Sequence, residues 1–355
     1  MRVVSLLPSA TETLCAIGGR DLLVGRSHEC DFPADLAGLD LPILTAARTH
    51  ATPAATDQPT SPSALIDAQV RDLLARREPL YTLDAALLAD LHPDLILTQD
   101  VCEVCSIDLA TVERIVADAA RSGLPTPTIL SLNPHTVEDV LDDMLRVGEA
   151  VGLKPQASRA VVRLQERLTA AQSFVNPYEE GPIVGFLEWT DPPFIAGHWT
   201  VQLIERAGGL HPLNPTIAPD GFGSAAGMQQ GSRRAGKSIA VEPEVFAATR
   251  PNCLVVAPCG LDLEAAWDAT KSIASHEWFQ SLPAVRAGRV AVADGNQMFN
   301  RPGPRLVDAF EWLVSWLQNR PELAPPGFPV RAWRNSAATP SQGADQHPSA
   351  NCARK

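Results

Sequence analysis

The feature that most constrains the fold of this chain is a repeated alternation of short apolar runs with amphipathic helices. The apolar runs have the length of buried strands, and they fall at residues 3–7, 22–26, 93–98, 128–132, 183–187, 254–257 and 290–292. Between the runs, apolar residues recur at helical spacing, as in residues 137–151. Such an alternation predicts parallel sheets with helices on both faces, which is an α/β fold of the doubly wound class.

The chain length favours two domains, because 355 residues exceed what one hydrophobic core usually serves. We expect an N-terminal α/β lobe at 1–155, a connecting helix at 156–176 and a C-terminal α/β lobe at 177–322. Beyond Pro321 the chain is rich in Pro, Ser, Ala and Gln, so we expect a disordered tail at 323–355. Two doubly wound lobes joined by one long helix would place a ligand cleft between the lobes.

Composition and motifs argue against several classes of protein. The formal net charge of -12 and the pI near 5.1 argue against a nucleic-acid partner, and no apolar run is long enough for a membrane span. Nucleotide-binding glycine motifs, hydrolase motifs and zinc-protease motifs are missing from the sequence, so we expect no enzyme. The seven cysteines are scattered, which is not the pattern of a disulfide scaffold.

The N-terminus carries no basic region, long apolar region or small-residue cleavage site, so we expect no signal peptide and a cytoplasmic location. A periplasmic or cell-surface location is the alternative if the true start lies upstream.

Polar and aromatic residues gather where the predicted strands end. In open parallel sheets, ligands bind outside the carboxyl ends of the strands. The loops at these ends are residues 8–12, 27–31, 99–105, 133–135, 188–199, 258–260 and 294–304. The sequence therefore indicates a binding site built from these loops.

Several of these segments resemble the cobalamin-binding, or iron-chelate/cobalamin-binding, family of ABC-transporter substrate-binding proteins. The resemblance covers about residues 1–320, through residues 5–12, 25–33, 93–100, 102–105, 188–193, 197–199, 207–209, 258–260 and 301–307. Its most specific parts are Ser27-His28-Glu29-Cys30-Asp31 and Cys102-Glu103-Val104-Cys105, which resemble a cobalamin-binding subgroup.

The resemblance implies that a corrinoid or another metal chelate lies between two lobes. Aromatic rings would contact the flat macrocycle, and polar side chains would meet its amide rim. The implied ligand-binding residues are Ser9, Glu12, His28, Glu29, Asp31, Gln99, Asp100, Glu103, Glu188, Trp189, Phe194, Trp199 and Arg301. The expected function is non-catalytic binding of cobalamin by a monomer, with an ABC permease as partner. Binding of a siderophore or haem is the alternative, as is cytosolic handling of a metal or corrinoid through His28 and the cysteines.

One histidine and three cysteines form a candidate metal site. His28, Cys30, Cys102 and Cys105 follow adjacent predicted strands, and one imidazole with three thiolates suits a tetrahedral soft-metal site. His28 alone is instead a candidate lower axial ligand to a corrinoid cobalt. The structural alternative is that the cysteines are small buried residues and that His28 caps a turn.

Other candidates also have structural alternatives. Trp189 is either a cleft residue or core packing, and Arg301 either contacts ligand or is tied to a carboxylate. Glu12 either contacts ligand or complements the dipole of the first helix.

Overall fold

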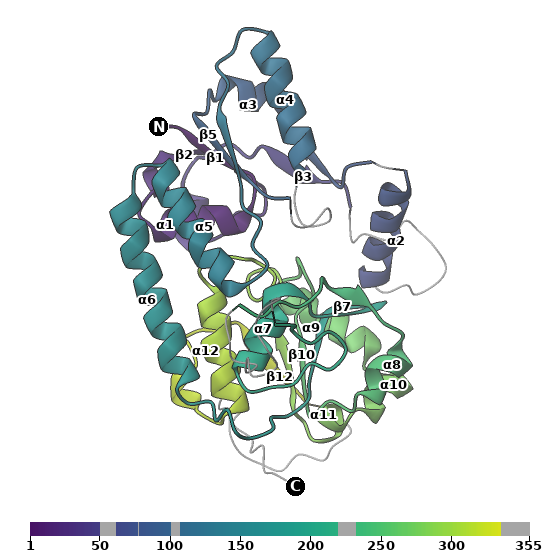
Figure 1. The fold of residues 1–355 in the computed structure, drawn as a ribbon. Helices are drawn as coiled ribbons and strands as arrows, with labels where there is room; N and C mark the ends of the chain where they lie inside the picture. The colour runs from purple at the N-terminus through teal and green to yellow at the C-terminus, as the bar shows by residue number, and fades with distance from the viewer. Residues whose placement is uncertain (50–61, 77, 101–106, 219–231, 335–355) are drawn as a thin grey trace. The chain divides into compact units, whose positions relative to one another are not determined.

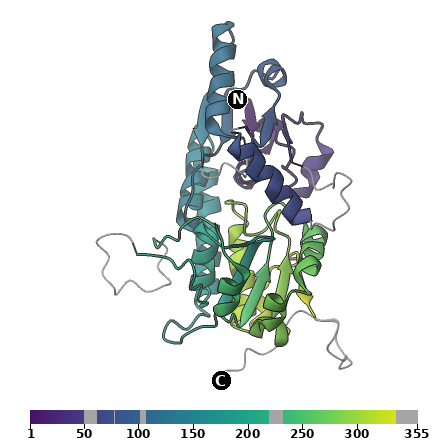
Figure 2. The ribbon, with the colours of Figure 1, turned by 90° about the vertical axis from the view of Figure 1, so that its right-hand side faces the viewer.

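The chain forms two compact units in the computed structural model, which describes residues 1–49, 62–76, 78–100, 107–218 and 232–334 (Figures 1 and 2). The first unit comprises Met1–Ala54, Leu65–Pro134 and Asp139–Leu164. The second comprises Ala55–Ala64, His135–Glu138 and Gln165–Lys355. Both units are therefore discontinuous in sequence, and the domain limits at residues 155 and 176 stay a prediction.

The first unit contains a parallel sheet of four strands in the order β2-β1-β5-β6. The strands are β1 Val3–Ser5, β2 Leu23–Arg26, β5 Leu95–Thr98 and β6 Thr128–Ser131. Its helices are α1 Pro8–Ala16, α2 Pro62–Ala75, α3 Ala85–Asp90, α4 Leu109–Arg121 and α5 Val137–Ala150, with short 3-10 turns at Arg20–Leu22 and Ala34–Gly38. Figure 1 shows α3 and α4 on one side of the sheet and α1 and α5 on the other. A separate antiparallel pair joins β3 Thr45–Ala47 to β4 Tyr81–Leu83.

Apolar side chains alternate between the two faces of these strands. Val4 and Ile96 pack in one cluster with Val112 and Val116 of α4. Burial of both faces explains why these strands read as continuous apolar runs in the sequence.

The expected loop at residues 8–12 was wrong, because these residues form the start of α1. Pro8 stands in the first turn of this helix, where its missing N–H costs nothing and its fixed φ suits the helix. Ser9 and Glu12 therefore project from a helix.

The second unit contains a six-stranded sheet in the order β12-β11-β10-β7-β8-β9. The strands are β7 Val184–Thr190, β8 Pro193–Ile195, β9 Ile239–Ala240, β10 Cys253–Val256, β11 Val290–Ala293 and β12 Val330–Trp333. The helices are α7 His198–Arg206, α8 Pro243–Ala248, α9 Leu263–Ile273, α10 Glu277–Ser281, α11 Pro283–Arg286 and α12 Leu306–Leu317, and a 3-10 turn spans Pro321–Leu323. The three strands at its centre, β7, β10 and β11, are parallel, whereas β8 and β12 are antiparallel to their neighbours.

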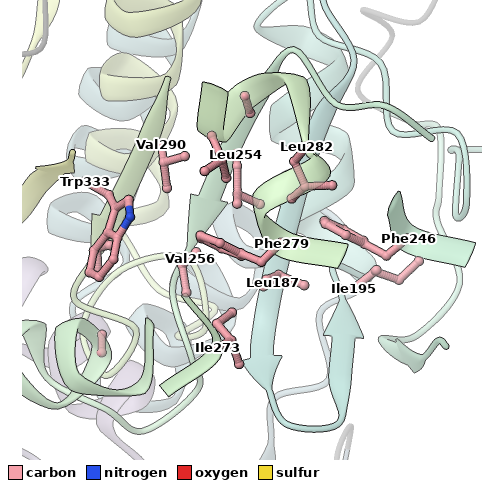
Figure 3. Packing of buried hydrophobic residues seen from close by; sticks show 14 residues of the cluster. Leu187, Ile195, Phe246, Leu254, Val256, Ile273, Phe279, Leu282, Val290 and Trp333 are labelled. Carbon is pink, nitrogen blue, oxygen red and sulfur yellow. The ribbon is translucent and has the colours of Figure 1, made fainter. Parts of the chain in front are cut away.

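An apolar cluster of the second unit lies between this sheet and helices α8 to α11. Figure 3 shows Phe279 of α10 directed at Leu254 and Val256 of β10, with Leu187 of β7 beside them. On the opposite face, Phe186 of β7 meets Phe299 edge-on at 5.1 Å between ring centroids. The strands of this sheet are thus covered on both faces, as the alternation predicted.

Two details of the second unit differ from the expectation. The strand predicted to end at residue 187 continues to Thr190, because Trp189 and Thr190 pair with Phe194 and Pro193 of β8. The disordered tail was wrong for residues 330–333, which form β12 beside β11 and bury Trp333. Local sequence pattern does not predict the two-residue turn at 191–192. Nor does it predict an edge strand whose pairing partner is distant in the sequence.

A long helix, α6 Lys154–Gln172, carries the chain from the first unit into the second. In its second half, Arg167 donates hydrogen bonds to Asp308 at 2.5 Å and to Glu311 at 2.9 Å, both on α12. In the part of the chain that the structure describes, no helix is long and apolar enough to cross a membrane.

Candidate functional site

The carboxyl ends of the parallel strands in each unit carry a polar cluster. In the first unit, these ends bring together Ser27, His28 and Cys30 after β2 with Thr45 of β3. In the second unit, they bring together Glu188, Trp189 and Thr190 of β7 with the start of α7. Each cluster is described by itself.

His28 is the best-defined candidate of the first unit. The Thr45 hydroxyl donates to Ser27 Oγ at 2.9 Å, so its single hydrogen is used there. Thr45 Oγ1 then accepts from His28 Nδ1 at 2.8 Å, which assigns the ring proton to Nδ1 and leaves the lone pair on Nε2. Burial lowers the pKa of His28, so the neutral ring prevails at neutral pH. A neutral imidazole whose other nitrogen is held by a hydrogen bond is the usual form of a histidine metal ligand.

The His28 side chain is partly exposed. The side chain is 27% exposed, and Glu29 Oε1 lies 4.0 Å from Nε2, which is too long for a hydrogen bond. Tyr81 of β4 supports the ring at 5.9 Å between centroids. The arrangement therefore presents one acceptor nitrogen at the carboxyl end of β2.

Cys30 is held differently. Its side chain is buried, and its sulfur lies 3.0 Å from Thr11 Oγ1 of α1. The Thr11 hydroxyl in turn donates to Ser5 Oγ at 2.8 Å. Cys102 and Cys105, the other two proposed thiolates, lie outside the described residues, as does Glu103. Among the residues described, no group of three His, Cys, Asp or Glu side chains is arranged to hold a metal ion.

The remaining candidates of the first unit differ in exposure. Ser9 and Glu12 are buried in α1, and Gln99 is buried after β5. Asp31 and Asp100 are exposed, and the Asp100 N–H donates to Asn133 Oδ1 at 2.7 Å. Ligand contact by these residues stays a prediction.

Glu188 in the second unit fixes the backbone around the start of α7. Its carboxylate accepts from the Ser238 hydroxyl and, at 3.4 Å, from the Gly197 N–H. Its own carbonyl accepts from the Cys259 N–H at 2.9 Å. These contacts link the ends of β7 and β10 to the segment before β9.

Trp189 is anchored at its polar edge. Its indole N–H donates to the Ser63 carbonyl at 3.2 Å, and the neighbouring Thr190 hydroxyl donates to Ser63 Oγ at 3.0 Å. Two adjacent residues of β7 thus hold the first turn of α2. Phe194 lies half-buried on β8 opposite Trp189.

Trp199 and Arg301 are both buried and hydrogen-bonded within the second unit. The Trp199 side chain is buried and its indole N–H donates to the Phe299 carbonyl at 2.6 Å. Arg301 is buried and donates to Asn296 Oδ1 at 2.9 Å. Contact of either with ligand stays a prediction.

Sequence reasoning missed two histidines of the second unit. His198 opens α7 with φ 47°, and its ring lies 5.5 Å from that of His135 and is stacked on Trp199. Both follow predicted strand ends in loops that were already singled out, so the signal was present. Only the fold shows that they meet.

Comparison with known proteins identifies the fold. No protein-family model matches the sequence, and no curated protein is similar to it at the sequence level. Among solved structures, the periplasmic haem-binding protein RhuT from Roseiflexus sp. RS-1 is 20% identical, covers 90% of this chain and 98% of its own, and superposes with a TM-score of 0.61. The periplasmic vitamin B12 binding protein BtuF of Vibrio cholerae is 18% identical, covers 90% and 96%, and has a TM-score of 0.56. A periplasmic haem-binding protein from Pseudomonas aeruginosa is 19% identical, covers 90% and 93%, and has a TM-score of 0.60.

These similarities confirm the predicted fold class and, at the level of the fold, the resemblance drawn from the sequence. The chain has the two-lobed α/β fold of periplasmic haem-binding and vitamin B12 binding proteins. The expectation of a cytoplasmic location was wrong, because the similar structures are described as periplasmic proteins. That expectation relied only on the first residues of the chain.

Proposed function

We propose that this chain is a non-catalytic binding protein for a metal chelate, cobalamin in the first place, and that it serves an ABC importer from the periplasm. The fold supports this proposal, since similar structures are described as haem-binding and vitamin B12 binding proteins. The segment Ser27-His28-Glu29-Cys30-Asp31 supports the corrinoid, because it resembles the cobalamin-binding subgroup.

The observation that carries the proposal is the acceptor nitrogen of His28. Thr45 and Ser27 hold the ring in the tautomer that leaves Nε2 unprotonated, and burial disfavours the charged form. Cobalt in a corrinoid and iron in a haem both accept an axial imidazole nitrogen. His28 is thus suited to bind the metal of the ligand without any chemical step.

Haem is the second candidate. Like a corrinoid, haem is a flat apolar macrocycle whose metal takes an axial ligand. Two of the similar structures are described as haem-binding proteins. The alternative of a thiolate metal site would use Cys30, whose buried sulfur lies 3.0 Å from Thr11 Oγ1.

The test is a spectroscopic titration of the full chain with aquocobalamin and with haemin. Imidazole coordination changes the absorption of either chelate, and we expect saturable binding with that change. His28→Ala should abolish the spectral change. Thr45→Val should weaken binding about 10-fold to 100-fold, as loss of an outer partner of a metal ligand usually does.

The matched control is His92→Asn, which replaces an exposed histidine of the same unit that has φ 42° with a residue tolerant of that backbone. It should bind as the unaltered chain does. Binding with an unchanged spectrum in His28→Ala would remove His28 from the site, and failure to bind either chelate would refute the function.

A further inference from the structure

Three basic groups of the second unit surround the first turn of α7. His198 is the first residue of that helix, His135 lies 5.5 Å from it between ring centroids, and Lys237 follows Gly236, whose carbonyl accepts from the His198 N–H at 2.8 Å. We call these three residues the His198 cluster. His135 and Lys237 are exposed, and His198 is half-buried.

The backbone and ring of His198 are held by their neighbours, but one ring nitrogen makes no hydrogen bond to the described residues. Its backbone is tied to Gly236, and its ring is stacked on Trp199 with 22° between the planes. Its Nδ1 atom is buried and has no hydrogen-bond partner among the described residues. A buried polar nitrogen without a partner costs free energy.

The acidic groups of the neighbouring elements are already engaged. Glu188 of β7 accepts from Ser238 and Gly197, and Glu138 of α5 accepts from Arg206 at 2.7 Å and from Gln202 at 2.9 Å. The pKa of His198 is lowered by burial first, and then by the charges of His135 and Lys237. The charges of His135 and Lys237 therefore disfavour a further positive charge on the His198 ring.

We propose that the His198 cluster binds an anionic substituent of the ligand, a phosphodiester or a carboxylate, and takes up a proton as it does so. This inference rests on the proposed function, and it identifies which chemical group of the chelate the second unit recognises. His198 and His135 donate N–H groups to the anion and Lys237 adds its charge. The start of α7 adds the positive end of a helix dipole to these side chains.

The sign of the pH effect follows from the charge. In the free protein His198 is neutral at neutral pH, whereas an anion in contact stabilises the protonated ring. The anion therefore raises the pKa of His198, and affinity for an anionic ligand should rise as pH falls. Each proton taken up contributes up to about tenfold in affinity per pH unit.

The first arm of the test uses small probes and needs no chelate. Histidine side-chain NMR of the full chain follows His198 during titration with dimethyl phosphate and with acetate, from about pH 7.5 to about pH 5.5. Dimethyl phosphate keeps one charge throughout this range. If the His198 cluster binds a phosphodiester, we expect dimethyl phosphate to raise the apparent pKa of His198. If it binds a carboxylate, we expect acetate to raise that pKa. If neither probe changes the apparent pKa of His198, the inference is overturned.

The second arm compares chelates that differ in one anionic group. Cyanocobalamin is compared with dicyanocobinamide, which lacks the phosphodiester, and haemin with its dimethyl ester. The charged member of a pair should bind more tightly as pH falls, and His198→Asn should remove that slope without weakening the uncharged member. His276→Asn, which alters an exposed histidine of the same unit, is the control and should keep the slope.

Two further variants protect the test against misfolding of His198→Asn. His135→Ala and Lys237→Ala alter exposed side chains, and each should weaken binding of the responding probe. If a small probe binds but no chelate does, the proposed function is refuted and anion binding by the His198 cluster is supported. If chelates bind with the same pH slope in every variant, the cluster fails and the proposed function stands.

Discussion

Replacing Gly197 with alanine should disrupt the junction between α7 and the segment before β9. A Cβ atom at residue 197 would lie 2.2 Å from the Ser238 nitrogen and 2.4 Å from the Lys237 carbonyl carbon. Both contacts are far inside van der Waals distance, and both partners are backbone atoms that cannot rotate away. The residue 197 backbone itself is extended and suits alanine, so the cost comes from the overlap alone.

The magnitude follows from what must move. Overpacking of this kind costs about 1–3 kcal/mol. Separating the two segments also weakens the bond from the His198 N–H to the Gly236 carbonyl, at 2.8 Å, and that from Asn214 Nδ2 to the Lys237 carbonyl, at 3.1 Å. At roughly 1 kcal/mol for each of the two hydrogen bonds, we expect a total loss of about 3–5 kcal/mol.

Guanidinium denaturation followed by tryptophan fluorescence measures this loss where it occurs, because all seven tryptophans belong to the second unit. Gly38→Ala is the matched control, since a Cβ there has open space and the backbone needs no left-handed φ. Calorimetry should place that variant within about 0.5 kcal/mol of the unaltered chain. A Gly197→Ala variant as stable as Gly38→Ala would refute the reasoning from overlap.

Three other variants test separate contacts. Ser63→Ala and Thr190→Val should couple by about 0.5–1.5 kcal/mol in a double-mutant cycle of unfolding free energies, and simple additivity would dismiss their buried hydrogen bond. Burial raises the pKa of Asp143 to about 6, so the folded chain holds that proton more tightly than the unfolded chain and stability falls as pH rises from about 4 to about 6. Asp143→Asn should flatten urea-derived stability over this range, and an unchanged slope would assign the effect elsewhere. Trp333→Ala should cost about 3–5 kcal/mol by calorimetry, because its ring is buried 4.8 Å from that of Trp267 between centroids; a neutral result would mean that β12 contributes nothing to the core.

The parallel strands were the most predictable part of the fold. The run at 128–132 corresponds to β6 Thr128–Ser131, and the one at 93–98 contains β5 Leu95–Thr98. β5 is buried on both faces, so its apolar content alone identifies it, whereas β6 lies at the sheet edge and is only partly buried. The edge strand β12 pairs with β11, which lies far from it in the sequence, and no local pattern predicts that pairing.

The candidate site was predictable as a set of loops but not as contacts. The strand-end rule placed His28 correctly after β2, whereas Glu188, expected beyond a strand end, lies inside β7. It did not supply Thr45, which determines the tautomer of His28 and comes from another strand. Nor did it supply the meeting of His135 with His198, which depends on where the first turn of α5 lies.

The discontinuity of the second unit has a consequence for synthesis of the chain. Residues His135–Glu138 belong to that unit, and Val137 and Glu138 are bound there by Gln202, with Arg206 holding Glu138 as well. During translation this segment leaves the ribosome long before α7 is synthesised. The N–H of Val137 therefore has no partner until Gln202, 65 positions later in the chain, has been added. A ribosome-bound fragment that ends before α7 can complete the parallel sheet of the first unit, yet the start of α5 would fray in it. Protection of the residue 137 amide should therefore appear late, together with the second unit rather than with the helix of which it is part.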